Sequence, residues 1–368
     1  MHILCGGIAL VLLLPRPGFA QVVSATDAMR KIKTSTNMAT VPTSASASIR
    51  AARNDFEAFQ IVIQGPANNV TATATSLTGP GTPLTAAGGC VNGEGVDGQI
   101  RLYQEAIINI TAATPSPTGG IGGYPDALIP NVDEFDLQCR NAFGFNVPSG
   151  QNRVIWYEVY VPSTQVAGIY TGTVTVSWTG GSKNIPVQLE VWDFPLPAQP
   201  SLRSFFALAY SELPAQHGTG PFGPTLTALR KKYSVMALDH RISTPNFDDG
   251  QAYTDIGDGG LYDQAMGPLI DGTAATHMPG ALMTSMNLMD NFNADTAKAW
   301  AIHFSNDHDW FSRLFMYAAD EPGSNAPHRT PWNQIAPHCD AAHSANDPTC
   351  PTCGDNFKTL VASTFDRV

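Results

Sequence analysis

The sequence predicts a multidomain fold, an N-terminal β-sandwich followed by a (β/α)8 barrel of the TIM type. The chain has 368 residues, more than a single hydrophobic core usually serves. It carries 33 Gly and 28 Pro against only 14% charged residues, a composition that suits short strands and tight turns. A proline-rich connector, residues 194–200, separates a strand-only pattern from an alternating one, so we expect two domains, residues 22–197 and 201–368.

The first twenty residues have the pattern of an export signal. An apolar run, residues 3–14, precedes Pro15-Arg16-Pro17 and the short segment Gly18-Phe19-Ala20. The run is too short to span a bilayer once cleavage is considered. It has no Lys or Arg before it, which keeps a membrane anchor open as the alternative. We expect residues 1–20 to be removed and the mature protein, without a membrane span, to be secreted, periplasmic or at the cell surface.

Short segments of alternating apolar and polar residues fill the N-terminal half. Residues 56–63 alternate before Gly65-Pro66, and residues 154–161 end at a proline. Residues 168–178 and 185–192 flank a Gly-Gly-Ser turn and are rich in β-branched residues, so they predict a hairpin. Strands of this length between turn signals predict a β-sandwich.

Beyond the connector, apolar segments alternate with segments of helical spacing. Strands are predicted at 204–210, 236–243, 281–287, 314–319 and 357–363, and helices at 225–233 and 295–309. Repeated strand–helix units favour a parallel sheet, and a (β/α)8 barrel is the preferred form. A complete barrel takes roughly 250 residues, so we expect this one to be truncated at its C-terminal side.

The net negative charge of the chain excludes some classes of binding partner. A net charge of −11 disfavours nucleic acid, because phosphate binding needs clustered Lys and Arg. A glycan made of neutral sugars or amino sugars fits better as a substrate. Nothing in the sequence calls for a cofactor.

Six cysteines are present, one of them in the export signal. Cys90 and Cys139 lie in loop-like sequence and are the predicted disulfide partners in an oxidising compartment. Cys339, Cys350 and Cys353, with His338 and His343 nearby, allow either a zinc site or one disulfide plus one free thiol. The oxidising compartment favours the disulfide, so we predict no metal.

The adjacent acids Asp320 and Glu321 carry the strongest functional signal. They end the apolar segment 314–319, and strand ends at the C-terminal rim are where a barrel presents catalytic side chains. Neighbouring strand residues normally point to opposite faces, but Pro322 fixes the following turn, so both acids can reach one cleft. One protonated and one ionised carboxyl group suit acid/base hydrolysis. The alternative is a structural role for both residues, with Asp320 in a turn and Glu321 at the N-terminus of a helix.

Residues 317–322 resemble the catalytic-strand motif of glycoside hydrolase family 123 and its uncharacterised relatives, the domain of unknown function 4091 type. Four further segments resemble the N-terminal domain of that family in the same order, and the likeness extends from about residue 30 to 365: residues 53–60, 124–130, 167–172 and 189–197.

The resemblance implies a β-sandwich, a (β/α)8 catalytic domain and cleavage of terminal β-linked N-acetylgalactosamine. It also implies substrate-assisted retention, in which the acetamido oxygen of the sugar is the nucleophile. Glu321 would then be the general acid/base, and Asp320 would hold the acetamido N–H. No metal is implied.

Other residues are weaker candidates for substrate binding. His240 and Arg241 end a predicted strand, Tyr210 and Asn287 occupy equivalent rim positions, and Tyr317 precedes the acids. Each can instead be a polar residue whose hydrogen bonds are made within the protein, or a residue that only packs against its neighbours. Two other functions stay open, a secreted non-catalytic glycan-binding or structural protein with a remnant barrel, and a metalloenzyme using the late Cys and His group.

Overall fold

The computed structural model describes residues 22–113, 120–206, 208, 212–220, 223–244, 256, 259–288, 293–322 and 330–362. Two compact units divide the chain. Unit 1 consists of Met1–Ala51, Glu57–Val159 and Val166–Trp192, and unit 2 consists of Ala52–Phe56, Tyr160–Gln165 and Asp193–Val368. The predicted export signal, residues 1–20, lies outside the described residues. Within them, no helix has the length and apolar character needed to cross a membrane.

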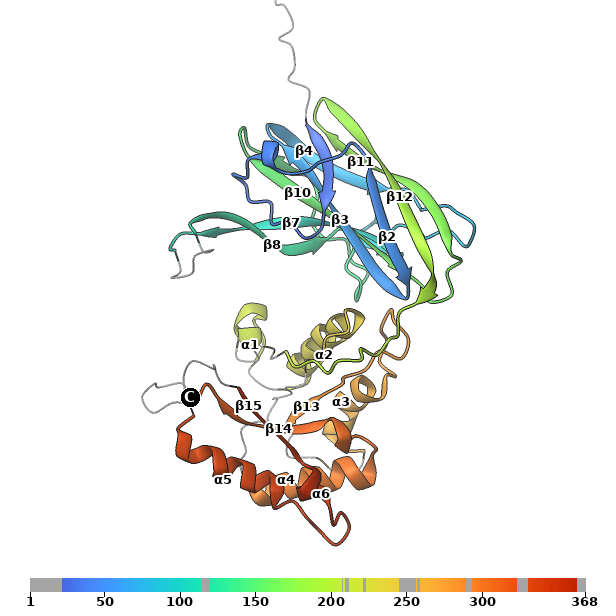
Figure 1. Cartoon of the computed structure of the whole chain (residues 1–368). Coiled ribbons are helices and arrows are strands. Elements are labelled where there is room, and N and C mark those ends of the chain that lie inside the picture. Colours follow the sequence, from blue (N-terminus) through green and yellow to red (C-terminus); the bar gives the residue numbers. More distant parts are fainter. Residues whose placement is uncertain are drawn as a thin grey trace, which may run out of the picture. The chain divides into compact units, whose positions relative to one another are not determined.

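Unit 1 is built on two five-stranded sheets (Figure 1). The first has, in spatial order, β1 (Val23–Asp27), β3 (Asp55–Gln64), β10 (Asn152–Val161), β7 (Ile100–Ile110) and β8 (Gly122–Pro130). The second has β2 (Ala47–Arg53), β12 (Gly181–Pro195), β11 (Gly168–Trp178), β4 (Ala67–Ala74) and β9 (Phe145–Val147). Shorter elements are the 3-10 turn Met38–Thr40 and the pair β5 (Gly88–Val91) and β6 (Glu94–Val96).

The hairpin of β11 and β12 shows why these residues form strands. Along β12 the residues Ile185, Val187, Leu189 and Val191 are buried and their neighbours are mostly exposed, the two-residue period of a half-buried strand. The register is unbroken from Gly168↔Val191 to Trp178↔Gly181. The hairpin predicted from the sequence is therefore confirmed.

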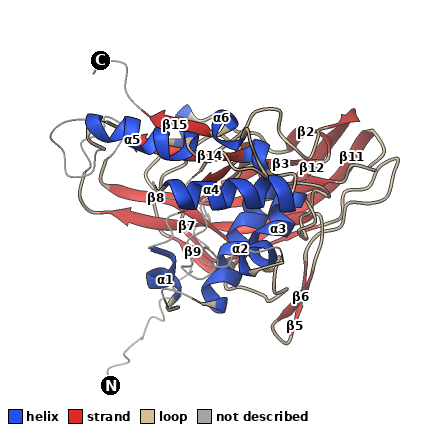
Figure 2. Cartoon of the chain, turned by 90° about the horizontal axis from the view of Figure 1, so that it is seen from below, coloured by secondary structure: helices blue, strands red, loops and turns tan. Residues whose placement is uncertain are grey.

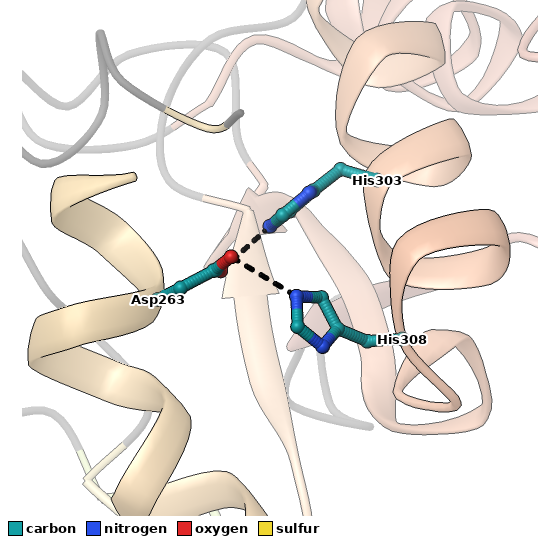
Figure 3. A group of neighbouring side chains, drawn as sticks. All are labelled: Asp263, His303 and His308. Atoms are coloured by element: carbon teal, nitrogen blue, oxygen red, sulfur yellow. Dashed lines mark hydrogen bonds and ion pairs between the residues drawn. The ribbon is translucent and has the colours of Figure 1, made fainter. Parts of the chain in front are cut away.

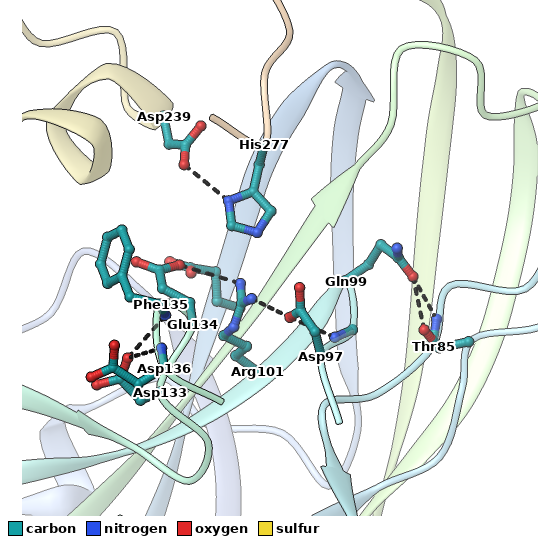
Figure 4. Close-up of polar contacts among 12 residues, drawn as sticks. Thr85, Asp97, Gln99, Arg101, Asp133, Glu134, Phe135, Asp136, Asp239 and His277 are labelled. Carbon is teal, nitrogen blue, oxygen red and sulfur yellow. Dashed lines mark hydrogen bonds and ion pairs between the residues drawn. The ribbon is translucent and has the colours of Figure 1, made fainter. Parts of the chain in front are cut away.

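A loop between β8 and β9 is fixed by covalent and ionic contacts within unit 1. Cys90 and Cys139, the pair that the sequence singled out, are joined by a disulfide. The buried guanidinium of Arg101, on β7, pairs with the carboxylates of Asp97 and Glu134 (Figure 4). Because a buried cation needs such partners, the Arg101 pairs hold the 133–139 loop against β7.

Unit 2 contains a parallel three-stranded sheet, β13 (Met286–Leu288), β14 (Leu314–Asp320) and β15 (Lys358–Ala362), with β14 in the middle. Its helices are α1 (Glu212–His217), α2 (Pro224–Asp239), α3 (Leu261–Asp271), α4 (Ala294–Ile302), α5 (Trp332–His343) and α6 (Cys353–Asn356). Helices α4 and α5 lie side by side in both views, and α5 packs against β14 (Figures 1 and 2).

The predicted (β/α)8 barrel is wrong. Fifteen strands and six α-helices are found in the described chain, which is no eight-fold alternation, and the parallel sheet has three strands there. Residues 236–239 are the end of α2 instead of a strand. Leu226, Arg230, Ser234 and Leu238 are buried at intervals of four, so the apolar residues near 236 continue one helix face.

Two other predicted strands differ from expectation. In the segment 204–210, residues 204–206 and 208 are irregular and the rest lies outside the described residues. In the segment 281–287, most residues are buried but irregular, and the strand β13 begins only at Met286. Burial without a ladder explains the misreading of 281–287, and the described residues of 204–210 are mostly apolar but partly or fully exposed. A short apolar run has the same composition in either state.

The core of unit 2 joins helices α3 and α4 to the sheet. Tyr262 of α3 meets Trp300 of α4 edge to face, with ring centroids 4.6 Å apart, and Phe304 packs on both. Met286 and Met316, from β13 and β14, belong to the same buried cluster. This packing gives β14 a rigid support.

Buried Glu105 gives unit 1 a pH-dependent stability. Burial raises the pKa of Glu105 from 4.5 to about 7, and the nearby charge of Lys31 opposes that rise only in part. The folded pKa exceeds the unfolded one, so the folded chain keeps a proton that the unfolded chain loses. The free energy of unfolding should therefore fall as pH rises from 4.5 to about 7, by up to about 1.4 kcal/mol per pH unit, and then level off.

Urea unfolding at about pH 5 and about pH 8 checks this expectation. Glu105→Gln should flatten the profile, and the exposed control Glu94→Gln should keep it. An equally steep fall in Glu105→Gln would assign the pH dependence to another group.

Candidate functional site

The predicted pair of acids lies at the carboxyl end of the central strand of unit 2. In β14 the residues Leu314, Phe315, Met316, Ala318 and Ala319 are buried, and the strand ends at exposed Asp320. Glu321 follows and is also exposed. The prediction that 314–319 is a strand ending at two acids is confirmed, and its flanking strands β13 and β15 run parallel to it.

A bulge in β14 changes which way Asp320 points. Tyr317 pairs with Leu360 of β15, and the next pair is Ala319 with Val361, so Ala318 is an extra residue. In a regular strand, residues three apart point to opposite faces. One extra residue reverses that relation, and the Tyr317 hydroxyl accordingly lies 2.8 Å from Oδ1 of Asp320. The bulge thus places Tyr317 and Asp320 on one side.

Tyr317 acts as a permanent hydrogen-bond donor to Asp320. Burial, the hydrogen bond and the negative charges of Asp320 and Glu321 together raise the pKa of Tyr317 to about 12. Its hydroxyl is therefore protonated throughout the neutral range. The hydroxyl therefore fixes the orientation of the Asp320 carboxylate.

Glu321 has a strained backbone. Its φ is 38°, in the left-handed region that residues with a side chain rarely adopt. Its N–H donates to the carbonyl oxygen of Ala362 at 2.9 Å, which fixes it beside the end of β15. Such strain costs on the order of 1–3 kcal/mol and clusters at functional sites. The strained residue is the one for which the resemblance to family 123 implies the role of general acid/base.

Asn287, predicted to line the rim, supports β14. It is buried in β13, and its Oδ1 accepts a hydrogen bond from the backbone N–H of Tyr317 at 3.1 Å. That bond lies at the start of the bulge, so Asn287 holds the irregular backbone in place. Tyr210, the other predicted rim residue, lies outside the described residues.

Three supporting contacts around β14 were missed from the sequence. Nδ1 of His338, on α5, lies 2.7 Å from the carbonyl oxygen of the extra residue Ala318 and can donate to it. Oγ1 of Thr330 accepts from the N–H of Asp320 at 3.3 Å. Phe205 packs on the ring of Tyr317, with centroids 5.7 Å apart. Nothing in the sequence marks the bulge, so the residues that contact it could not be predicted from the sequence either.

His240 and Arg241 do not end a strand, which corrects their predicted placement. His240 is the exposed C-cap of α2, with its ring 4.9 Å from that of Phe56. Arg241 has a φ of 59° and donates to the carbonyl oxygens of Pro197 and Asn54 and to Asp55, at 2.9, 2.6 and 3.2 Å. These hydrogen bonds join separate segments of unit 2, and a role of either residue in substrate binding stays a prediction.

The three cysteines near the C-terminus form one disulfide and one free thiol, the alternative to a zinc site. Cys350 and Cys353 are joined by a disulfide, and Cys339 is a free thiol. Among the described residues, the group with ligand spacing is Asp263, His303 and His308 instead (Figure 3). Its only sequence signal was two histidines five residues apart, because Asp263 lies 40 residues before His303.

Comparison with known proteins gives an informative likeness among solved structures. No protein-family model and no curated protein matches the sequence. Among solved structures, the chain is similar to a family 123 glycoside hydrolase from Clostridium perfringens, studied for glycolipid glycan hydrolysis, with a TM-score of 0.58 and 11% identity. The match covers 93% of this chain and 63% of that chain. It shows a shared fold, and the relation to the domain of unknown function 4091 type stays a prediction.

Weaker likenesses carry no argument. A protein described as catalysing macrocyclization in alchivemycin A biosynthesis matches with a TM-score of 0.21 and 9% identity. That match covers 48% of this chain and 91% of that one. A pilin subunit from enterotoxigenic Escherichia coli matches with a TM-score of 0.20, 8% identity and coverage of 46% and 98%.

Replacing Arg241 separates its structural role from the predicted substrate contact. Arg241→Gln removes charged donors from three acceptors, so the free energy of unfolding should fall by about 2 kcal/mol. The control Arg50→Gln breaks an exposed ion pair with Glu190 and should cost less than about 1 kcal/mol. Thermal and urea unfolding measure both. If Arg241→Gln kept its stability and bound sugar more weakly, Arg241 would be assigned to substrate binding.

Proposed function

We propose that this protein is a glycoside hydrolase that cleaves terminal β-linked N-acetylhexosamine, of the N-acetylgalactosamine type, by substrate-assisted retention. The observation that carries the proposal is the end of β14, where the exposed acids Asp320 and Glu321 follow a buried strand and the Tyr317 hydroxyl orients Asp320. The fold likeness to a family 123 glycoside hydrolase supports it. We further propose that the enzyme acts outside the cytoplasm after loss of residues 1–20.

In the proposed first step, the acetamido oxygen of the sugar attacks the anomeric carbon and the glycosidic C–O bond breaks. Glu321 gives its proton to the leaving oxygen. In the second step, water attacks the anomeric carbon, Glu321 takes the water proton, and the oxazolinium ring opens to the retained sugar. No group outside the substrate, water and these side chains is needed to balance the reaction.

Asp320 is suited to hold the acetamido N–H. A carboxylate accepts several hydrogen bonds, so Asp320 can keep Tyr317 on Oδ1 and still accept from a substrate N–H. A carboxylate at that N–H stabilises the positive charge that develops on the oxazolinium. The Tyr317 hydroxyl fixes the orientation of Asp320, which makes Tyr317 a positioning residue.

Glu321→Gln removes the proton donor and keeps the size of the side chain. Hydrolysis of aryl N-acetylgalactosaminides with poor leaving groups should fall by about 10²–10⁴-fold, whereas substrates with good leaving groups should lose much less. Rates across a leaving-group series measure this. The control Glu212→Gln, an exposed helix acid, should keep wild-type rates. A uniform loss across the series would remove Glu321 from the acid role.

Asp320→Asn tests substrate assistance. In the wild type, rates should fall as fluorine atoms replace hydrogens on the acetamido methyl, because the oxygen becomes a weaker nucleophile. Asp320→Asn should lower kcat by roughly 10²–10³-fold on acetamido sugars, and the control Asp340→Asn, also exposed, should not. Equal hydrolysis of galactosides without the acetamido group would contradict the mechanism.

A further inference from the structure

A second polar cluster of unit 2 lies at the first turn of α3 and the end of α4, and the proposed hydrolysis does not use it. Nε2 of His303 lies 2.9 Å from Oδ1 of Asp263, and Nε2 of His308 lies 3.0 Å from Oδ2 of the same carboxylate (Figure 3). The three potential ligand atoms lie within 4.8 Å of one another. Two imidazole nitrogens therefore converge on one carboxylate.

The contacts of both ring nitrogens of His303 with carboxylates require a proton or a metal cation between Nε2 and Asp263, or between Nδ1 and Asp307, beyond the single N–H of a neutral imidazole. Nδ1 of His303 lies 2.9 Å from Oδ2 of Asp307, while Nε2 faces Asp263. A neutral imidazole has one N–H and one lone pair. With the hydrogen toward Asp307, the lone pair of Nε2 faces a carboxylate oxygen, and the two electron pairs repel unless a proton or a metal cation lies between them.

The arrangement around the cluster is that of a metal site with its supporting shell. A histidine ligand commonly donates its other N–H to a carboxylate, as His303 can to Asp307. The ring of His308 stacks on Trp310 at 3.6 Å, and Nε1 of Trp310 donates to Asp271 at 2.6 Å, so the orientation of His308 is set independently of Asp263.

A local change of helix type brings the two histidines together. Residues His303–Asp307 form a π-helical turn directly after α4. A π turn has more residues than an α turn, so positions five apart come closer to one face. His303 is 2% exposed and the side chain of His308 is 21% exposed, which leaves the cluster closed on one side and accessible on the other.

We propose that Asp263, His303 and His308 form a binding site for a divalent transition-metal ion, with zinc as the best match. Two imidazoles and one carboxylate are typical zinc ligands, and the fourth tetrahedral position would be taken by water on the accessible side. Tetrahedral donors around zinc lie roughly 3.3 Å apart. The three potential ligand atoms already lie within 4.8 Å of one another, so shifts of the side chains alone can bring them to ligating positions. The ion links α3 to the turn after α4 and stabilises unit 2.

Metal binding to the full-length protein tests the proposal. After dialysis against zinc and then metal-free buffer, about one equivalent should remain bound in the wild type and in the control His343→Ala, an exposed histidine of α5. His308→Ala and Asp263→Asn should bind at least about tenfold more weakly, a loss expected for removal of one ligand. Zinc should also raise Tm in the wild type and not in His308→Ala.

Cobalt distinguishes this cluster from the cysteines. A tetrahedral Co²⁺ complex with nitrogen and oxygen ligands should show visible d–d bands without thiolate charge-transfer bands, and His308→Ala should lose them. Circular dichroism establishes that each variant is folded. Absence of zinc from the wild type, equal affinity in folded His308→Ala, or thiolate bands would overturn the proposal and leave a hydrogen-bonded network of these side chains.

Discussion

The hydrogen bond from Tyr317 to Asp320 depends on one extra residue in the central strand of unit 2. Without the bulge at Ala318, Tyr317 and Asp320 would point to opposite faces of the sheet. The backbone irregularity is held by Asn287 on one side and His338 on the other. The proposed site thus rests on buried polar groups whose own hydrogen bonds keep a strand out of regular register.

Stability and function compete at the end of β14. Glu321 adopts a left-handed backbone conformation, and its N–H is bound by Ala362 of the neighbouring strand. A glycine would relieve the strain but would carry no carboxyl group. The apolar core formed by α3, α4 and the sheet offsets the cost, because packed interiors resist local relaxation. The hydrolase proposal gives that strain a function, which is to place a second acid beside Asp320 at the end of the strand.

Sequence patterns predicted the strands whose apolar residues alternate clearly. They failed where contacts between residues far apart in the chain determine the structure. The hairpin of β11 and β12 was predictable because its burial alternates strictly. Residues near 236 were read as a strand, although the four-residue interval from Leu226 to Leu238 marks a helix face. Asp320 and Glu321 could be found because they end an apolar run. The bulge, the role of Arg241 and the cluster around His303 depend on residues far apart in the chain, so local patterns do not contain them.

The most direct test of the proposed site is a crystal structure with a thiazoline analogue of N-acetylgalactosamine, which mimics the oxazolinium. We predict that its ring nitrogen is hydrogen-bonded to Asp320, that Tyr317 still donates to the other oxygen of Asp320, and that Glu321 faces the position of the leaving oxygen. An analogue bound away from β14, or carboxyl groups of Asp320 and Glu321 on opposite faces of the sheet, would contradict the proposal.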